Sequence, residues 1–345
     1  MKLIDPNGMT FLLGVHAEVP TGNLLWVDPV NGNDALAKRG SMSMPFKTLT
    51  AAKNAATSGD TIMVFPGNYV MGGVTLAKDG VNWHFMNGAK VVSASGAVSH
   101  FEVGPGMSFN VTGWGCFDCS NSHHVLEFTS DADGTVEFEC TAMTSTYHET
   151  IWKRNGSAII TADLIHSALS AVVNLDGDMK VEAGAILSDY YTGVYAVSGN
   201  VGIKARSIIS GSASAVQCVG PAQLDIEAGE ISSPSGGGAA AVLDTRSVEL
   251  GAGEGILTIR NARLFSGSIT IVFSGMITGD PPEPVGTPPQ LRLWNCFLKE
   301  YSGTIFSYGG YWNVYTHGYC TCNQMADSPE FTIVGAPLLE EPTLE

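Results

Sequence analysis

The sequence predicts an all-β protein, a right-handed parallel β-helix built as a single-stranded solenoid with about 22 residues per turn and an N-terminal capping α-helix. Two observations lead to this fold class. One apolar pattern recurs seven times along the chain, and the composition is rich in glycine and poor in charge. The 345 residues include 41 glycines, and 14% are Asp, Glu, Lys or Arg, against about 25% in ordinary soluble proteins.

The N-terminal part of the chain is predicted to contain a strand, a turn, a helix and a second strand. A short strand starting at Leu24 runs into a turn rich in Asn and Gly that ends at Asp34. Residues 46–57 are expected to form one helix with Thr48 as its N-cap. The following segment, Gly59-Asp-Thr-Ile-Met-Val-Phe-Pro-Gly-Asn-Tyr69, returns to the period of two that is typical of a strand.

This order of strand, turn, helix and Gly-Asp-Thr-Ile…Pro-Gly-x-Tyr strand resembles the N-terminal cap of right-handed parallel β-helix proteins of the pectin-lyase-like superfamily. The resemblance is tightest over residues 24–92 and includes the motif Gly80-Val-Asn-Trp-His-Phe85. The cap looks most like that of phage tailspike and tail-fibre-associated members, whereas most superfamily relatives are enzymes that act on polysaccharides. A short helix across the first turn covers an exposed sheet edge and an open apolar end.

Internal repetition justifies the solenoid. Each copy reads apolar, any, apolar, any, small, with an apolar residue three positions later and usually Ser five positions later. The small positions are Cys140, Ala162, Ala183, Ala205, Ala228, Asn261 and Asn295, at spacings of 22, 21, 22, 23, 33 and 34. Because residues two apart face the same way, we expect Leu224, Ile226 and Ala228 to point inward and Asp225 and Glu227 outward.

The same register predicts two further columns of stacked residues. The outward column before the small residue mixes signs, so that like charges do not stack, and contains Glu139, Thr161, Glu182, Lys204, Glu227, Arg260 and Trp294. The Ser that ends most copies is expected at a bend, where its hydroxyls form ladders.

The chain divides accordingly into an N-terminal extension (1–23), the cap with the first turn (24–70), the parallel β-helix (71–325) and a C-terminal tail (326–345). Two turns are longer than the others. Their extra residues are rich in Gly and Pro, which do not fit a ladder, so we expect loop insertions near 235–255 and 279–290.

Charge restricts the partners. The 33 acidic residues outnumber the 17 basic ones, giving a net charge of −16. We therefore expect no nucleic-acid partner, which needs a basic face, and no membrane partner, and a polyuronate would meet like charge. A neutral glycan or a host-surface receptor remains as partner. The apolar stretch 11–15 is too short for a signal peptide core, so we expect a virion protein made in the host cytoplasm, with its seven cysteines largely as free thiols.

A search for catalytic groups finds none of the patterns that the polysaccharide lyases and glycosidases of this superfamily need, so no catalytic residue is predicted. Cys116, Cys119, His123 and His124 superficially offer four zinc ligands. Alternation sends neighbouring strand residues to opposite faces, however, and no second cluster completes the usual spacing, so we predict no metal and no cofactor.

Aromatic residues gather near the C-terminal end, where seven lie between Tyr301 and Tyr319. Rings separated by glycines suit stacking on sugars, and they equally suit a terminal cap or a subunit interface. The predicted ligand-binding residues are Tyr308, Tyr311, Trp312 and Tyr315.

Together these features favour a virion-associated structural or host- and glycan-recognition protein of a phage, without a catalytic site and assembled as a homotrimer. The alternative is a polysaccharide-degrading enzyme, a lyase or a glycoside hydrolase, with an unfamiliar site. A bacterial surface adhesin is a third hypothesis, which the lack of an evident export signal disfavours.

Overall fold

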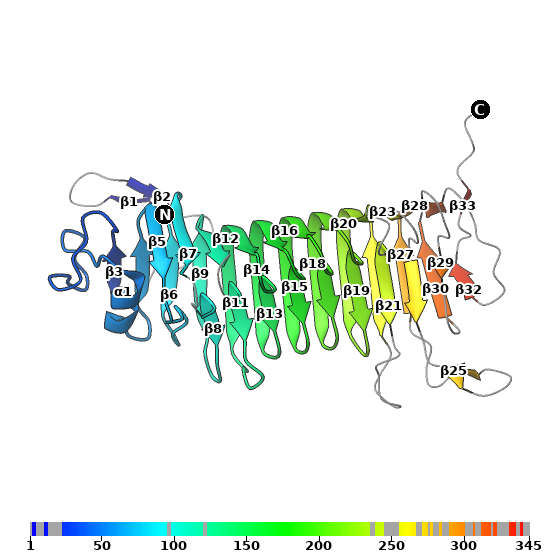
Figure 1. The fold of residues 1–345 in the computed structure, drawn as a ribbon, viewed down its shortest axis with the longest axis horizontal. Coiled ribbons are helices and arrows are strands. Elements are labelled where there is room, and N and C mark those ends of the chain that lie inside the picture. The colour runs from blue at the N-terminus through cyan, green and yellow to red at the C-terminus, as the bar shows by residue number, and fades with distance from the viewer. Residues whose placement is uncertain are drawn as a thin grey trace.

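The protein is an elongated parallel β-solenoid of about nine stacked turns with about 23 residues each (Figure 1). The predicted fold class is therefore confirmed. The structure is a computed structural model. It describes residues 2–4, 10–12, 23–94, 98–119, 123–234, 239–244, 255–266, 271–274, 277–278, 283–284, 290–300, 306–307, 312–318, 320–322, 331–335 and 339–340.

The turns contribute strands to three faces, the third of which begins at β8 and ends at β29 in the described residues, and within a face all pairings are parallel. The first face contains β3 (Leu24–Val27), β4 (Thr61–Val64), β6 (Asn82–Phe85), β9 (Phe109–Gly113), β22 (Ile256–Arg260), β27 (Gln290–Trp294), β30 (Trp312–His317) and β32 (Phe331–Gly335). The second contains β5 (Gly67–Met71), β7 (Ala89–Ser93), β10 (Cys116–Cys119), β23 (Arg263–Ser266), β28 (Phe297–Glu300), β31 (Thr321–Cys322) and β33 (Leu339–Glu340).

Five strands of eleven residues run through both of these faces and bend between them: β12 (Thr135–Ser145), β14 (Ser157–Ser167), β16 (Asp178–Ser188), β18 (Asn200–Ser210) and β20 (Gln223–Ser233). The third face contains β8 (Phe101–Val103), β11 (Leu126–Phe128), β13 (Ile151–Lys153), β15 (Val172–Asn174), β17 (Val194–Ala196), β19 (Val216–Val219), β21 (Ala241–Asp244), β24 (Ile271–Ser274) and β29 (Phe306–Ser307).

Two antiparallel pairs stand apart from the stacked turns. They join β1 (Lys2–Ile4) to β2 (Thr10–Leu12) and β25 (Ile277–Thr278) to β26 (Glu283–Pro284). The second pair lies within the predicted 279–290 insertion and its N-terminal flank, beside the rod in Figure 1.

The cap contains α1 (Leu49–Ala55), which packs on β3 and β4 through Leu49 and Ala52. The predicted N-cap is confirmed, since the Thr48 hydroxyl accepts a hydrogen bond from the backbone N of Ala51 at 3.2 Å. The helix is shorter than the expected 46–57 because Phe46 is still extended and donates its N–H to the carbonyl of Trp26. No helix in the described ranges is long and apolar enough to cross a bilayer.

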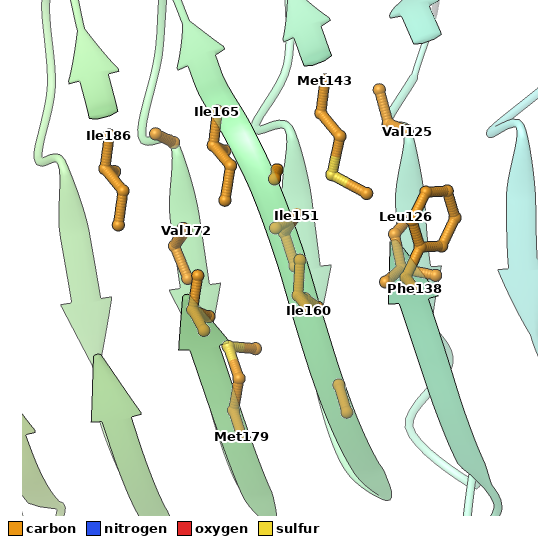
Figure 2. Packing of buried hydrophobic residues seen from close by; sticks show 14 of the residues in the cluster. Val125, Leu126, Phe138, Met143, Ile151, Ile160, Ile165, Val172, Met179 and Ile186 are labelled. Atoms are coloured by element: carbon orange, nitrogen blue, oxygen red, sulfur yellow. The ribbon is translucent and has the colours of Figure 1, made fainter. Parts of the chain in front are cut away.

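Equivalent residues of successive turns stack directly over one another in the core. Figure 2 shows Met143, Ile165 and Ile186 side by side, as their backbone pairing requires. The predicted orientation of the repeat is confirmed, because Ile226 is fully buried between the exposed residues Asp225 and Glu227. Burial of such columns, turn after turn, supplies the hydrophobic stabilisation of the rod.

The Ser column is buried, and its hydroxyls bond differently from the expected ladders. Each donates to a backbone carbonyl of the loop that follows the long strand of the previous turn, and the pairs are Ser167 with His148 (2.7 Å), Ser188 with Leu169 (2.6 Å), Ser210 with Tyr191 (2.6 Å) and Ser233 with Ala213 (2.7 Å). The column therefore fixes each of these loops to the end of the long strand of the next turn, and its buried hydroxyls are not presented to a ligand.

Lys153 is a charged residue inside the solenoid. Its Nζ atom donates to Asn174 Oδ1 at 2.9 Å and to the carbonyl of Asp176 at 2.5 Å. Burial lowers the pKa of Lys153 to about 8, and the carboxylates of Asp176 and Asp178 offset this only in part. The lysine thus satisfies polar groups of a buried turn.

Asp60 joins separate parts of the cap. Its carboxylate accepts hydrogen bonds from the backbone N of Asn23 at 3.1 Å and of Thr57 at 2.7 Å, and Arg39 lies 2.5 Å away. Burial alone raises the pKa of Asp60, but the hydrogen bonds from Thr57 and Asn23 and the charge of Arg39 together lower it.

We predict that Ile226→Asp destabilises the protein by more than about 4 kcal/mol, because it buries a charge without a partner. Asp225→Asn should change the free energy of unfolding by less than about 1 kcal/mol, since it removes only an exposed ion pair with Arg260. Thermal unfolding of both variants measures this. Equal melting temperatures would contradict the inward and outward assignment.

We predict that Asp60→Asn costs about 1–3 kcal/mol at neutral pH. A carboxylate whose pKa is lower in the folded state stabilises above its ordinary value of 3.8 and loses that contribution as the pH falls through the folded pKa. The difference in melting temperature between wild type and variant should therefore be constant near neutral pH and shrink below about pH 4. A difference that persists unchanged in acid would rule this explanation out.

Candidate functional site

A shallow groove follows the bend of the eleven-residue strands on the outer surface. Its volume is about 520 Å³, and it crosses β14, β16, β18 and β20. Small residues form its floor because the chain turns there, and the inward side chains at the bend are the predicted Ala162, Ala183, Ala205 and Ala228. The groove therefore arises directly from the small position of the repeat.

Glycine is needed just after the bend where two turns approach closely. A Cβ atom added to Gly184 would lie 2.4 Å from the carbonyl oxygen of Asp163, and one added to Gly229 would lie 2.8 Å from that of Arg206. These glycines let the backbones of successive turns pack and leave the groove open between the longer side chains on its two sides.

The charged side chains of the groove are mixed in sign. Glu182, Lys204 and Glu227 lie in one column on one side, and Asp163 and Arg206 lie on the other. All five are exposed. Carboxylates accept and ammonium or guanidinium groups donate hydrogen bonds, so this lining suits a ligand with many hydroxyls and no large charge of its own.

Beyond the groove, the same column continues into stacked rings. Pairing places Glu227 beside Arg260, then Trp294, then His317. The Arg260 guanidinium lies 5.2 Å from the centroid of the Trp294 ring, and the rings of Trp294 and His317 are stacked with centroids 4.2 Å apart. The pairing confirms the predicted outward column, in which the signs are mixed. The sequence missed His317 because the turn that contains it departs from the repeat.

The carboxylates of the groove show no catalytic pairing among the residues that the structure describes. Glu182 forms an ion pair with Lys180 at 3.1 Å, and Glu227 accepts a hydrogen bond from Asn261 at 3.2 Å. Lys180 lies outside the groove, and Asn261 lines the groove but does not titrate. Within the described ranges, no hydrogen bond joins one of these carboxylates to another titratable side chain of the groove.

Of the four aromatic residues predicted to bind ligand, only the side chain of Tyr315 falls within what the structure describes. Tyr308 and Tyr311 lie outside the described residues, and Trp312 is described only as the first position of β30. Tyr315 is half-buried on β30, in the column that contains Arg292. Their role in binding stays a prediction.

Exposed tyrosines that the sequence analysis did not single out lie along another edge of the rod. Tyr147, Tyr190 and Tyr191 are each more than half exposed. Tyr147 and Tyr190 come two residues after Ser145 and Ser188, which occupy the same column. Their shared position two residues after the repeated Ser was the sequence signal that could have predicted this row of exposed tyrosines.

The two cysteines offered as zinc ligands, and a pair of acidic residues that follows them, are placed by the strands and turns around them. Cys116 faces outward and Cys119 is buried, so they point to opposite sides as expected. In the acidic pair Asp131 and Asp133, the first accepts a hydrogen bond from Thr129 and the second from the backbone N of Gly106. These carboxylates stabilise turns.

Comparison with known proteins agrees with the fold. A family model described as "Protein of unknown function (DUF1565)" matches residues 30–73, and this family is found in parallel β-helix proteins. The matched segment starts in the turn after β3, includes α1 and β4, and ends just after β5. No curated protein and no solved structure gives a significant match. The chain is thus a parallel β-helix protein, and its likeness to phage tailspikes stays a prediction.

We predict that Gly184→Ala destabilises the protein by about 1–3 kcal/mol, because the added methyl group collides with the backbone of the preceding turn. Gly202→Ala on β18 is the matched control, since a Cβ atom there has no neighbour within 4 Å. It should be neutral or stabilise by up to about 1 kcal/mol. Urea unfolding measures both, and equal losses would contradict the close approach at the bend.

Proposed function

We propose that this protein is a virion-associated β-helix protein of a phage that recognises a neutral glycan of the host surface along the groove at the bend, and that it does so without catalysis. The observation that carries the proposal is the groove itself, an exposed strip in which donors and acceptors alternate from turn to turn. Phage association rests on the resemblance of the cap.

The repeat distance of the fold supports a polymeric ligand. Successive turns are about 4.8 Å apart, so the hydrogen-bonding side chains of Glu182, Lys204 and Glu227 recur at a short, regular spacing along the rod. A ladder of parallel strands keeps them in place before the ligand arrives, which reduces the entropic cost of binding.

Charge supports a neutral ligand. Three carboxylates and two basic groups line the groove, and the chain as a whole has a net charge of −16. A polyuronate would be repelled by this field, whereas a neutral sugar chain is indifferent to it and can use donors and acceptors alike.

We place the contacts of the proposed homotrimer on the outer surface of the second face, in the part of the long strands that follows the bend. Leu164, Leu187 and Ile209 point outward there and are only half-buried within one chain. Uncharged apolar residues of this kind are typical of contacts between subunits. Light scattering of the purified protein should give the mass of three chains, and a monomer mass would remove this part of the proposal.

One observation favours the alternative of a glycoside hydrolase. Glu182 and Glu227 flank Lys204 in the same column, two turns apart, which separates their backbones by about 10 Å. Pairs of carboxylates that cleave glycosidic bonds with inversion lie about 6.5–9.5 Å apart. The binding experiment therefore includes a measurement of cleavage.

We predict that the protein binds neutral polysaccharides in a panel of neutral and uronate polymers, and that the double variant Lys204→Ala/Arg206→Ala weakens binding by roughly tenfold or more, about 1.4 kcal/mol. The matched control is Lys38→Ala/Lys47→Ala, which removes the same charge from two exposed residues of the cap, outside the groove. Calorimetric titration measures both.

Two results would contradict this proposal. Equal loss of binding in the two double variants would show that net charge, and not the groove, determines affinity. Release of reducing ends from a bound polymer, abolished by Glu182→Gln, would establish the enzymatic alternative.

A further inference from the structure

Five histidine and glutamate side chains gather on two successive turns, away from the groove. His123, His124 and Glu127 lie at the start of β11, and His148 and Glu149 precede β13 in the next turn. The two strands pair with Leu126 beside Ile151. His123 and His148 therefore occupy the same place in successive turns, and their rings are stacked with centroids 5.1 Å apart.

The ligand atoms of this histidine cluster form two overlapping sets, each close enough to share one ion. Those of His123, His124 and Glu127 all lie within 4.8 Å of one another, and so do those of His124, His148 and Glu149. His124 belongs to both sets. Ligands about 2.1 Å from a tetrahedral ion are about 3.4 Å apart, so small side-chain rotations bring either set into range.

The His124 ring is already oriented for binding. Its Nδ1 atom lies 2.7 Å from the carbonyl oxygen of Glu149. A carbonyl only accepts hydrogen bonds, so Nδ1 is the protonated nitrogen and the lone pair is on Nε2. A metal-binding histidine usually donates its other N–H in this way. The ring is buried and stacks on Trp152 with centroids 5.8 Å apart.

The carboxylate of Glu127 is held in a similar manner. Ser99 donates its hydroxyl to Glu127 Oε2 at 2.6 Å, and the same Ser99 oxygen accepts the backbone N–H of His124 at 3.2 Å. This serine on the preceding turn links two of the ligands, so three turns of the solenoid contribute to the arrangement.

We propose that this cluster binds one divalent transition-metal ion of the zinc class. His124 is the common ligand, His123 and His148 supply two further nitrogens, and one carboxylate, from Glu127 or Glu149, completes the site. Imidazole and carboxylate ligands together suit zinc and its neighbours, whereas calcium and magnesium prefer a shell made of oxygen atoms. The bound ion connects successive turns and stabilises the solenoid at this level.

The thiols close in sequence do not belong to the site. Cys119 is buried in the core, and its Sγ atom donates to the backbone carbonyl of His124 at 3.1 Å. Cys116 points outward on a different column, beside Ala142. The site is thus assembled from residues of neighbouring turns and not from the Cys-x-x-Cys motif.

The experiment titrates the full-length, chelator-treated protein with Co²⁺, whose visible absorption reports its coordination, and then displaces Co²⁺ with Zn²⁺. We expect one ion per chain, and a melting temperature that rises by several degrees with Zn²⁺ and not with Ca²⁺. In His123→Gln/His148→Gln, affinity should fall roughly a hundredfold and the rise in melting temperature should disappear.

His166→Gln/His317→Gln is the matched control, because it removes two histidines outside the cluster. It should bind as the wild type does. Unchanged affinity in the His123/His148 variant, a thiolate-to-cobalt absorption band in the near ultraviolet, or equal stabilisation by Ca²⁺ would each overturn the proposal. The chelator-treated variants should melt at the same temperature as chelator-treated wild type, which separates loss of a ligand from loss of the fold.

Discussion

Parallel hydrogen bonding between successive turns, in register along whole strands, is the constraint on which the rest of this structure depends. It places each residue directly beside its equivalent one turn away, so every position of the repeat becomes a column. Inside, columns such as Ala162, Ala183 and Ala205 must be small or apolar. Outside, like charges would repel at this spacing, and the column from Glu182 through Lys204 to Glu227 alternates in sign accordingly. The shortage of charge in the composition has the same cause.

The bends and loops follow from the columns. Small residues at the bend allow the walls to turn sharply, and the absence of bulk there opens the groove. The buried Ser column fixes each loop to the strand leading out of the bend. The backbone of these loops is held, but their side chains differ between turns, and the exposed tyrosines Tyr147 and Tyr190 and part of the histidine cluster lie in them. Both proposed sites therefore combine side chains that are about one turn apart in sequence and adjacent in space.

Residues at the bend of the long strands separate what local sequence predicts from what it does not. Sequence reasoning predicted Ile226 inward and Asp225 outward, because a strand admits only two orientations and one face is buried. It aligned Asn261 and Asn295 with the inward Ala column, and the strand pairing on both sides of the bend keeps that register. The inward orientation that this alignment implied for their side chains was wrong. Both adopt positive φ at the bend and are exposed, and the Asn295 amide donates to Asn261 Oδ1 at 3.2 Å. Ala262 and Cys296 face inward instead. The alternation of inward and outward side chains cannot reveal a residue whose backbone adopts the left-handed conformation, although Asn tolerates that conformation better than most residues.

Local periodicity and the chemistry of single residues were thus enough to predict the fold class, the orientation of the repeated strands and the N-cap at Thr48. Contacts outside the repeat follow from the stacking of the turns and could not be predicted in this way. The pattern that aligns Ala162 with Ala183 says nothing about His123 and His148, whose loops carry no periodic signal. Their meeting depends on how two loops lie once the strands that flank them have paired, and that is a property of the stacked turns as a whole.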